Sequence, residues 1–410
     1  MKAITLMVVA CAVIAIVLFT AGCTQPAGQP TSSNVTLQKS SVSLVYMNPG
    51  QMPQLLATGQ VDGYMAWQPF VSIADVSKIG TVVSYSQDLP PKQVWEDHSC
   101  DSLVARNDIV SAHPDMTNAL SAVFVEATNY TRNNPDRAAE ISADWLFGSS
   151  NLTYGNVTIN SVDVEKASIP TIKFTNDPSD QWITSNDRFI GALKEIGFIS
   201  GTLSNVTPNA SHAMLYNFVP YNTANGMLAT KTIVSPTTAP AKISIGYLLS
   251  DHDAPLFVAV KNWKYFLDNY GFALKPKVDT AGKVEQAELI VNNQKVADVQ
   301  LVKGDGGPQL MTLLGSNTID FAVAGTPPTI AAVDKGTPIK ILFPVHTEGS
   351  GLVVTSKSSA KDWNSFIAWI NERSASGKPV KIAVAPKGSI QDVQLEYALE
   401  QSGVAVTEAK

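Results

Sequence analysis

The sequence is poor in cysteine and contains none of the common catalytic or cofactor motifs. Only Cys11, Cys23 and Cys100 occur in 410 residues. No cysteine and histidine residues follow one another at the spacing of a zinc site. A nucleophile elbow, a phosphate-binding loop and a dinucleotide fingerprint are also missing. The sequence therefore predicts no metal, no cofactor and no enzymatic activity.

Charged residues are also few. They make up 16% of the chain, and the formal net charge is −6. No stripe of Lys and Arg with interleaved aromatic residues occurs, which argues against nucleic acid as a partner. The hydrophobic fraction of 45% is that of an ordinary globular protein. The length allows two or three domains, each large enough to bury a core.

The N-terminus has the pattern of a secretory signal. Lys2 precedes an apolar run over residues 4–19, and small residues then lead to Cys23. This end resembles a lipobox, so we expect a signal peptide over 1–22, lipid on Cys23 and a polar tether over 23–40. The alternative is an uncleaved transmembrane helix. Both interpretations place the rest of the chain outside the cytoplasm, and the first anchors it to the membrane by lipid.

Beyond the tether, short apolar runs alternate with helical patterns, which is typical of sheets covered by helices. We expect strands over 42–47, 243–247, 339–344 and 381–385, and helices over 116–133, 255–270 and 391–401. A Pro-, Thr- and Ala-rich stretch at 222–242 indicates a linker between two compact segments.

A weak internal repeat relates the two segments. Residues 53–69 and 308–327 both contain a proline-opened helix, a glycine stop, an aspartate, an apolar strand and a proline turn. Two similar α/β lobes are therefore expected, with a cleft at the carboxyl ends of their strands.

Four segments resemble the nitrate/sulfonate/taurine-type solute-binding proteins, a group that also includes binders of thiamine precursors. They are residues 246–252, 319–332, 382–389 and 59–70, of which the last is similar to the group's D-A-x-x-x-W-x-P-F segment, with Gly63 in the Ala place. The resemblance implies a two-lobed periplasmic-binding-protein-like fold of type II, in which each lobe is a mainly parallel sheet with flanking helices.

The order of these segments differs from that of the group, because the segment around Trp67 precedes the one around Tyr247. We expect a circular permutation cut inside the second lobe; the alternative is a fragment that pairs with another chain. The expected parts are 41–170 (lobe two), 171–221 (lobe one, returning), 222–242 (linker), 243–349 (lobe one, main part) and 350–410 (lobe two, first part).

Turns at the strand ends are expected to line the cleft. Backbone N–H groups at helix starts, together with Ser and Thr hydroxyls, can hold an anion without a metal. The aromatic residue of the group's motif is expected to form a wall of the pocket. The candidate ligand-binding residues are Ser250, His252, Gly325, Thr326, Ser350, Gly388, Ser389, Trp67, Gln68 and Asn48, with His98 a weaker candidate. Each Ser or Gly among them also suits an ordinary helix cap, and Cys100 is expected to be a small buried residue.

The resemblance implies a binding protein that delivers a small anionic solute, such as a sulfonate, taurine or nitrate, to the permease and ATPase complex of an ABC importer. A binder of a thiamine-precursor pyrimidine and a sensory ectodomain are the alternatives. An enzyme is a weaker one, although the implied fold also hosts a thiamine-pathway synthase.

Overall fold

The computed structural model describes residues 40–409, which form one compact unit. The signal peptide, Cys23 and all of the tether before Ser40 lie outside the described residues. Among residues 40–409, no helix combines the length and the apolar character needed to cross a bilayer.

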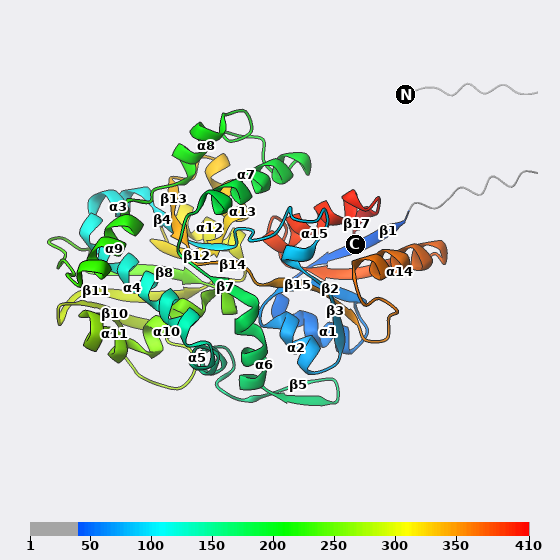
Figure 1. Ribbon diagram of the computed structural model, residues 1–410, viewed down its shortest axis with the longest axis horizontal. Helices are drawn as coiled ribbons and strands as arrows, with labels where there is room; N and C mark the ends of the chain where they lie inside the picture. Colours follow the sequence, from blue (N-terminus) through cyan, green and yellow to red (C-terminus); the bar gives the residue numbers. More distant parts are fainter. Residues whose placement is uncertain (1–39, 410) are drawn as a thin grey trace, which may run out of the picture. The chain divides into compact units, whose positions relative to one another are not determined.

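A six-stranded sheet combines strands from both ends of the chain, as the blue and the red-orange strands in Figure 1 show. Its first four strands are parallel, whereas β15 runs antiparallel to β2 and to β3. Its spatial order is β17 (Ala405–Glu408), β1 (Ser41–Tyr46), β16 (Val380–Val384), β2 (Gly63–Trp67), β15 (Ser350–Thr355) and β3 (Gly80–Tyr85).

A seven-stranded sheet forms the second half of the fold. Its centre, β11–β8–β12, is parallel, and antiparallel strands extend it on both sides. Its spatial order is β13 (Ile339–Pro344), β4 (Asp101–Arg106), β12 (Phe321–Gly325), β8 (Lys242–Tyr247), β11 (Gln294–Lys303), β10 (Gln286–Val291) and β9 (Phe272–Pro276). Both sheets are therefore mixed where mainly parallel sheets were expected: the first is parallel from its β17 edge to β2, and the second is parallel only at its centre.

Two small ladders complete the strands: β14 (His346–Glu348) with β7 (Ile172–Phe174), and β5 (Asn151–Tyr154) with β6 (Val157–Asn160). The helices are α1 (Met52–Ala57), α2 (Phe70–Val76), α3 (Asn107–Ala112), α4 (Pro114–Asn133), α5 (Pro135–Phe147), α6 (Ser161–Ser168), α7 (Asp180–Glu195), α8 (Pro208–Leu215), α9 (Val219–Thr230), α10 (Ala254–Lys261), α11 (Trp263–Tyr270), α12 (Gly307–Gly315), α13 (Thr326–Asp334), α14 (Trp363–Ala375) and α15 (Ile390–Gln401).

The repeat seen in the sequence is present as the same order of elements. It is α1–β2–α2 around the six-stranded sheet and α12–β12–α13 around the seven-stranded sheet. Pro53 and Pro308 each lie in the first turn of their helix, where a proline loses no helical hydrogen bond. The following strands are fully buried, as central parallel strands covered on both faces must be.

Two expected boundaries need correction. Strand β4 pairs with β12 and β13, so the chain returns to the seven-stranded sheet between β3 and β4 and not near Pro170. Helices α4 and α5 go with it, because Val123 and Trp145 belong to the same buried cluster as Phe257 and Phe321. The expected linker 222–242 also contains the end of α9 and the start of β8, so residues 231–241 connect these two elements.

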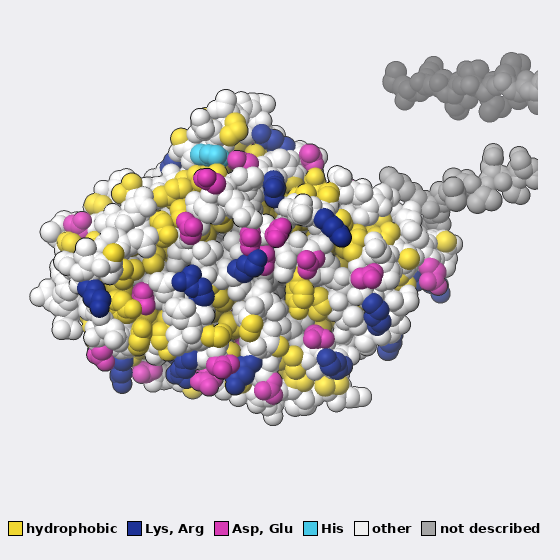
Figure 2. All heavy atoms as spheres, in the orientation of Figure 1, with side chains coloured by type: hydrophobic (Ala, Val, Ile, Leu, Met, Phe, Trp, Pro, Cys, Tyr) yellow, Lys and Arg dark blue, Asp and Glu magenta, His cyan; other side chains and the backbone are white. Residues whose placement is uncertain are grey.

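On the face of the molecule drawn in Figure 2, basic and acidic side chains are interspersed and form no continuous field of one sign.

Candidate functional site

Strand ends of the two sheets meet at Gln68, the residue after β2. Its carbonyl oxygen accepts a hydrogen bond from the Ser250 hydroxyl and another from the Asp251 N–H, both at 3.1 Å. Ser250 and Asp251 follow β8 of the other sheet. The carboxyl ends of β2 and β8 therefore face each other directly, as the cleft of two α/β lobes requires.

His252 lies on a 3-10 turn after β8, and hydrogen bonds hold both its backbone and its side chain. Its backbone N–H donates to the Ser250 hydroxyl at 3.1 Å, and its Nε2 lies 2.7 Å from the carbonyl oxygen of Gly349. A carbonyl can only accept, so the proton is on Nε2 and the Nδ1 lone pair is left free. Burial lowers the pKa of His252 to about 4, so the ring is neutral at physiological pH.

Thr326 opens α13 at the end of β12. Its hydroxyl donates to the carbonyl oxygen of Cys100 at 2.9 Å and lies 2.5 Å from the Ser99 hydroxyl. Gly325, before it, is the buried N-cap residue of α13. The expected hydroxyl donor at this turn is thus occupied by the start of β4.

The six-stranded sheet supplies the opposite side. Ser389 caps α15 by accepting the Asp392 N–H at 3.3 Å, and Gly388 (φ +79°) donates to the Asp392 carboxylate at 2.7 Å. The Ser350 hydroxyl accepts from the Gln391 amide at 2.8 Å. These are the ordinary cap and bridge functions that the sequence also allowed.

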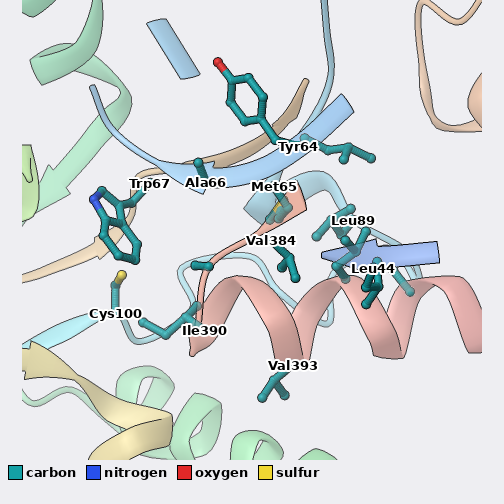
Figure 3. Packing of buried hydrophobic residues seen from close by; sticks show 14 of the residues in the cluster. Leu44, Tyr64, Met65, Ala66, Trp67, Leu89, Cys100, Val384, Ile390 and Val393 are labelled. Atoms are coloured by element: carbon teal, nitrogen blue, oxygen red, sulfur yellow. The ribbon is translucent and has the colours of Figure 1, made fainter. Parts of the chain in front are cut away.

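Trp67 is the exception among the candidates. Its side chain is 5% exposed, and its indole N–H has no hydrogen-bond partner. Figure 3 shows the ring extending from β2 toward Cys100 and Ile390, with which it shares a buried cluster. An unpaired buried donor costs about 1–3 kcal/mol, so a partner supplied by a ligand would relieve a real penalty.

The other candidates are less free. Both ends of the Gln68 amide are engaged, with Thr171 and with the N–H of Ser72. Asn48 is exposed and caps a 3-10 turn through Gly50. Its amide reaches the Asp305 carbonyl, in the loop after β11, at 3.5 Å.

Three residues outside the list of candidates join His252. The ligand atoms of Cys100, Asp101, His252 and His346 all lie within 4.8 Å of one another, and all four residues are buried. The sequence could not reveal this group, because its members come from three distant segments. The one signal was that each borders a buried strand. The expectation that no cysteine and histidine residues cluster holds for the spacing along the chain and is wrong for the fold.

Carboxyl groups crowd the same region. Burial raises the pKa of Asp101 to about 7 and that of Asp251 to about 6. It raises the pKa values of Glu165 and Asp253 further, with the neighbouring acids adding to the effect. Each of the four keeps at least one buried oxygen without a partner. No Lys or Arg in residues 40–409 forms a salt bridge with any of them.

The curated relatives of this chain are named either "putative binding protein" or "uncharacterized protein". A protein of Methanocaldococcus jannaschii named "uncharacterized" is 36% identical over 135 residues, which are 33% of this chain and 90% of that protein. A Brucella abortus protein named "putative binding protein" is 26% identical over 106 residues, which are 26% of this chain and 32% of its own length. A Brucella suis protein of the same description matches equally. The alignment thus spans about a third of the Brucella proteins. No solved structure matches.

The family described as NMT1-like matches residues 24–146 and 237–410, which are well over half of the chain. The two matched segments hold every strand of both large sheets and all ten candidate ligand-binding residues, whereas Glu165 lies between the segments. The chain is an α/β protein with two mixed sheets flanked by helices, it is related to proteins named "putative binding protein", and it belongs to the NMT1-like family.

Proposed function

We propose that this protein is the extracytoplasmic solute-binding component of an ABC importer and that it has no enzymatic activity. The observation that carries this is the contact at Gln68, where the end of β2 meets the turn after β8 and leaves the Trp67 N–H unpaired beside it. Two lobes that close over a small solute require such strand ends to face each other.

The solute is a small molecule with an anionic group, such as a sulfonate, taurine or nitrate. The Trp67 N–H and the N-terminus of α15 are the donors available on the six-stranded side. Two buried acids, Asp251 and Asp253, lie on the opposite side in the turn after β8, and Glu165 of α6 is close to Asp251. Taurine, which carries an ammonium as well as a sulfonate, suits both sides, whereas nitrate suits only the first.

Two further candidate functions remain. A thiamine-precursor pyrimidine could stack on Trp67, since an aromatic wall suits a planar ring. A sensory ectodomain would use the same cleft without a permease. The importer is favoured because the relatives of stated role are named as binding proteins.

A matched pair of ligands tests the proposal. Titration calorimetry of the full-length chain with taurine and with ethanesulfonate compares the same sulfonate with and without the ammonium group. Binding of taurine at least about tenfold tighter than ethanesulfonate, equal to 1.4 kcal/mol, supports the zwitterion. Binding of neither of these, nor of nitrate or the pyrimidine, contradicts a solute-binding role.

The anchor is a lipid on Cys23, and closure around the solute prepares the lobes to dock on the permease and ATPase complex. This rests on the sequence, since Cys23 lies outside the described residues. Labelled palmitate is expected to be incorporated by the full-length chain and not by Cys23→Ser, which should be recovered without membranes. Equal labelling of both chains would contradict the anchor.

The chain order is that of a circular permutation. Strand β1 lies between β17 and β16, so the first described strand is enclosed by the last two. The Ala405 N–H donates to the Ser40 carbonyl oxygen at 2.8 Å, which places the two ends of the described chain beside each other. At the other junction, residues 231–241 lead from α9 into β8.

A further inference from the structure

The group formed by Cys100, Asp101, His252 and His346 has the composition of a metal site. Asp101 begins β4 and Cys100 directly precedes it, His252 follows β8, and His346 begins β14. Their ligand atoms lie within 4.8 Å of one another, and Cys100 Sγ is 3.6 Å from His252 Nδ1. Metal–ligand bonds of 2.0–2.3 Å in a tetrahedron place ligand atoms about 3.3–3.8 Å apart. Side-chain rotations that move the ligand atoms by about 1 Å would therefore bring all four within bonding distance of one ion.

Both imidazoles present a lone pair to this group. His252 donates its Nε2–H to the Gly349 carbonyl at 2.7 Å, which leaves Nδ1 free toward Cys100. His346 Nδ1 lies 3.4 Å from the Thr347 carbonyl oxygen, and its Nε2 accepts a hydrogen bond from the Asp101 backbone N–H at 3.4 Å, which a bound metal would replace. Metal-binding histidines typically donate the second ring N–H to a carbonyl or carboxylate, which fixes the tautomer.

The charges also match a divalent cation. Cys100, Asp101, His252 and His346 are each at most 3% exposed, so none is solvated by bulk water. A thiolate and a carboxylate together carry two negative charges, which a divalent ion neutralises. The second Asp101 oxygen, Oδ2, is buried without a hydrogen-bond partner. Asp253 is a further acidic residue whose charge interacts with both Cys100 and Asp101. No Lys or Arg of the described residues forms a salt bridge with it.

We infer that Cys100, Asp101, His252 and His346 bind one divalent transition-metal ion of the zinc class, through one sulfur, one oxygen and two nitrogen atoms. Thiolate and imidazole ligands select zinc, cobalt or copper over magnesium and calcium. The ion would link the starts of β4 and β14 to the turn after β8. Through the His252–Gly349 hydrogen bond it would also hold the segment between β14 and β15, where the chain passes from one sheet to the other. This inference does not depend on which solute the protein carries.

Cobalt provides the direct test, because a thiolate–cobalt bond gives a near-ultraviolet charge-transfer band and a tetrahedral site gives visible bands. The full-length chain is stripped with chelator and dialysed against Co²⁺ and, separately, Zn²⁺. We expect one ion per chain and a thiolate band in the wild type. Cys100→Ser should lose that band, and His346→Gln should weaken Zn²⁺ binding at least about tenfold.

His98→Gln is the matched control, because His98 is also fully buried but is hydrogen-bonded to Ser86 and Ser99 outside the group. It should keep one ion per chain. A folded wild-type chain that retains no stoichiometric ion, or that binds cobalt without a thiolate band, overturns the inference. So does Zn²⁺ binding that Cys100→Ser and His346→Gln leave unchanged. The wild-type measurement decides the question even if a variant fails to fold, and its outcome is separate from solute binding.

Discussion

The Trp67 indole is the residue on which the proposed function depends most. Its N–H is the one polar atom of the candidate ligand-binding residues that is both buried and without a partner in the described chain. The hydroxyls of Ser250 and Thr326 donate inside the protein, whereas those of Ser350 and Ser389 only accept in the hydrogen bonds that hold them. At the scale of single residues, the donors that remain for a solute are therefore the Trp67 N–H and the hydroxyls of Ser350 and Ser389.

Trp67→Phe keeps a ring and removes this donor. A hydrogen bond to a charged group contributes about 1.5–3 kcal/mol, so taurine affinity should fall by at least about tenfold. Trp363→Phe is the control, because the Trp363 N–H already has a partner. It donates to Ser402, which directly follows the C-terminal end of α15, and not to a residue near the end of β2. Titration calorimetry checks both. Equal affinity for wild type and Trp67→Phe would remove Trp67 from the binding site.

Asp392 gives the fold a measurable pH dependence. Burial, with Glu396 nearby, raises the pKa of Asp392 to about 7. Because the unfolded carboxyl titrates near 3.9, the unfolded chain releases a proton between about pH 4 and 7 that the folded chain keeps. Stability from this group is therefore present below pH 4 and lost as pH rises toward 7, by up to about 1.4 kcal/mol per pH unit.

Asp392→Asn should remove that part of the slope in urea unfolding between pH 4.5 and 7, while its oxygen can still accept the Gly388 N–H. Asp362→Asn is the contrast, because hydrogen bonds with Ser365 lower the pKa of Asp362 and move its effect to more acidic pH. It should leave the slope in this window unchanged. An unaltered slope in Asp392→Asn would mean that the buried carboxyl is not protonated in the fold.

Single residues at turns could be predicted from the sequence, whereas their partners could not. Ser389 was recognisable as a helix cap because a cap depends on three neighbouring residues. That Cys100, His252 and His346 meet depends on how three strands are ordered in space. No local pattern contains that order, so the sequence indicated a small buried cysteine where the fold has a cluster.

At the scale of elements, the turn before α15 depends on a glycine. Gly388 has φ +79°, and a Cβ there would lie 2.2 Å from the ring of Phe198. Gly403, at the other end of α15, has φ +74° and open space around it. An L-residue would be strained at both positions, but only at Gly388 would its Cβ also clash with Phe198, which follows α7.

Gly388→Ala should therefore destabilise the protein by about 1 kcal/mol or more beyond Gly403→Ala. The left-handed backbone costs about 1–2 kcal/mol at either site, and the clash adds to it only at Gly388. Chemical denaturation of the two variants gives the difference. Equal losses would show that Phe198 moves aside freely.

The elements themselves were largely predictable. The expected strands over 243–247 and 339–344 and the expected helix over 391–401 are confirmed as β8, β13 and α15. The expected helix over 255–270 is divided at Asn262 into α10 and α11. The placement of β4 was missed, because an antiparallel strand leaves no sign in the sequence of which sheet it joins.

At the scale of the whole molecule, a rearranged chain tests the permutation. It would run from 241 to 404, pass through two glycines in place of the edge strand β17, and continue from 40 to 230. Since Ser40 and Ala405 are already hydrogen-bonded neighbours, we expect a folded monomer with a midpoint of thermal unfolding within about 5 °C of the wild type. A rearranged chain that does not fold, or a native chain that folds only as a dimer, contradicts a permuted single fold.

The central claim is that this fold captures a small solute, and thermal unfolding of the full-length chain tests it most directly. The panel is taurine, alkanesulfonates, nitrate, bicarbonate and pyrimidines, each at high concentration. A ligand at 100 times its Kd stabilises the folded state by about 2.7 kcal/mol. The account predicts a rise of several degrees with taurine or a close relative. A folded sample whose midpoint moves with none of these solutes would contradict it.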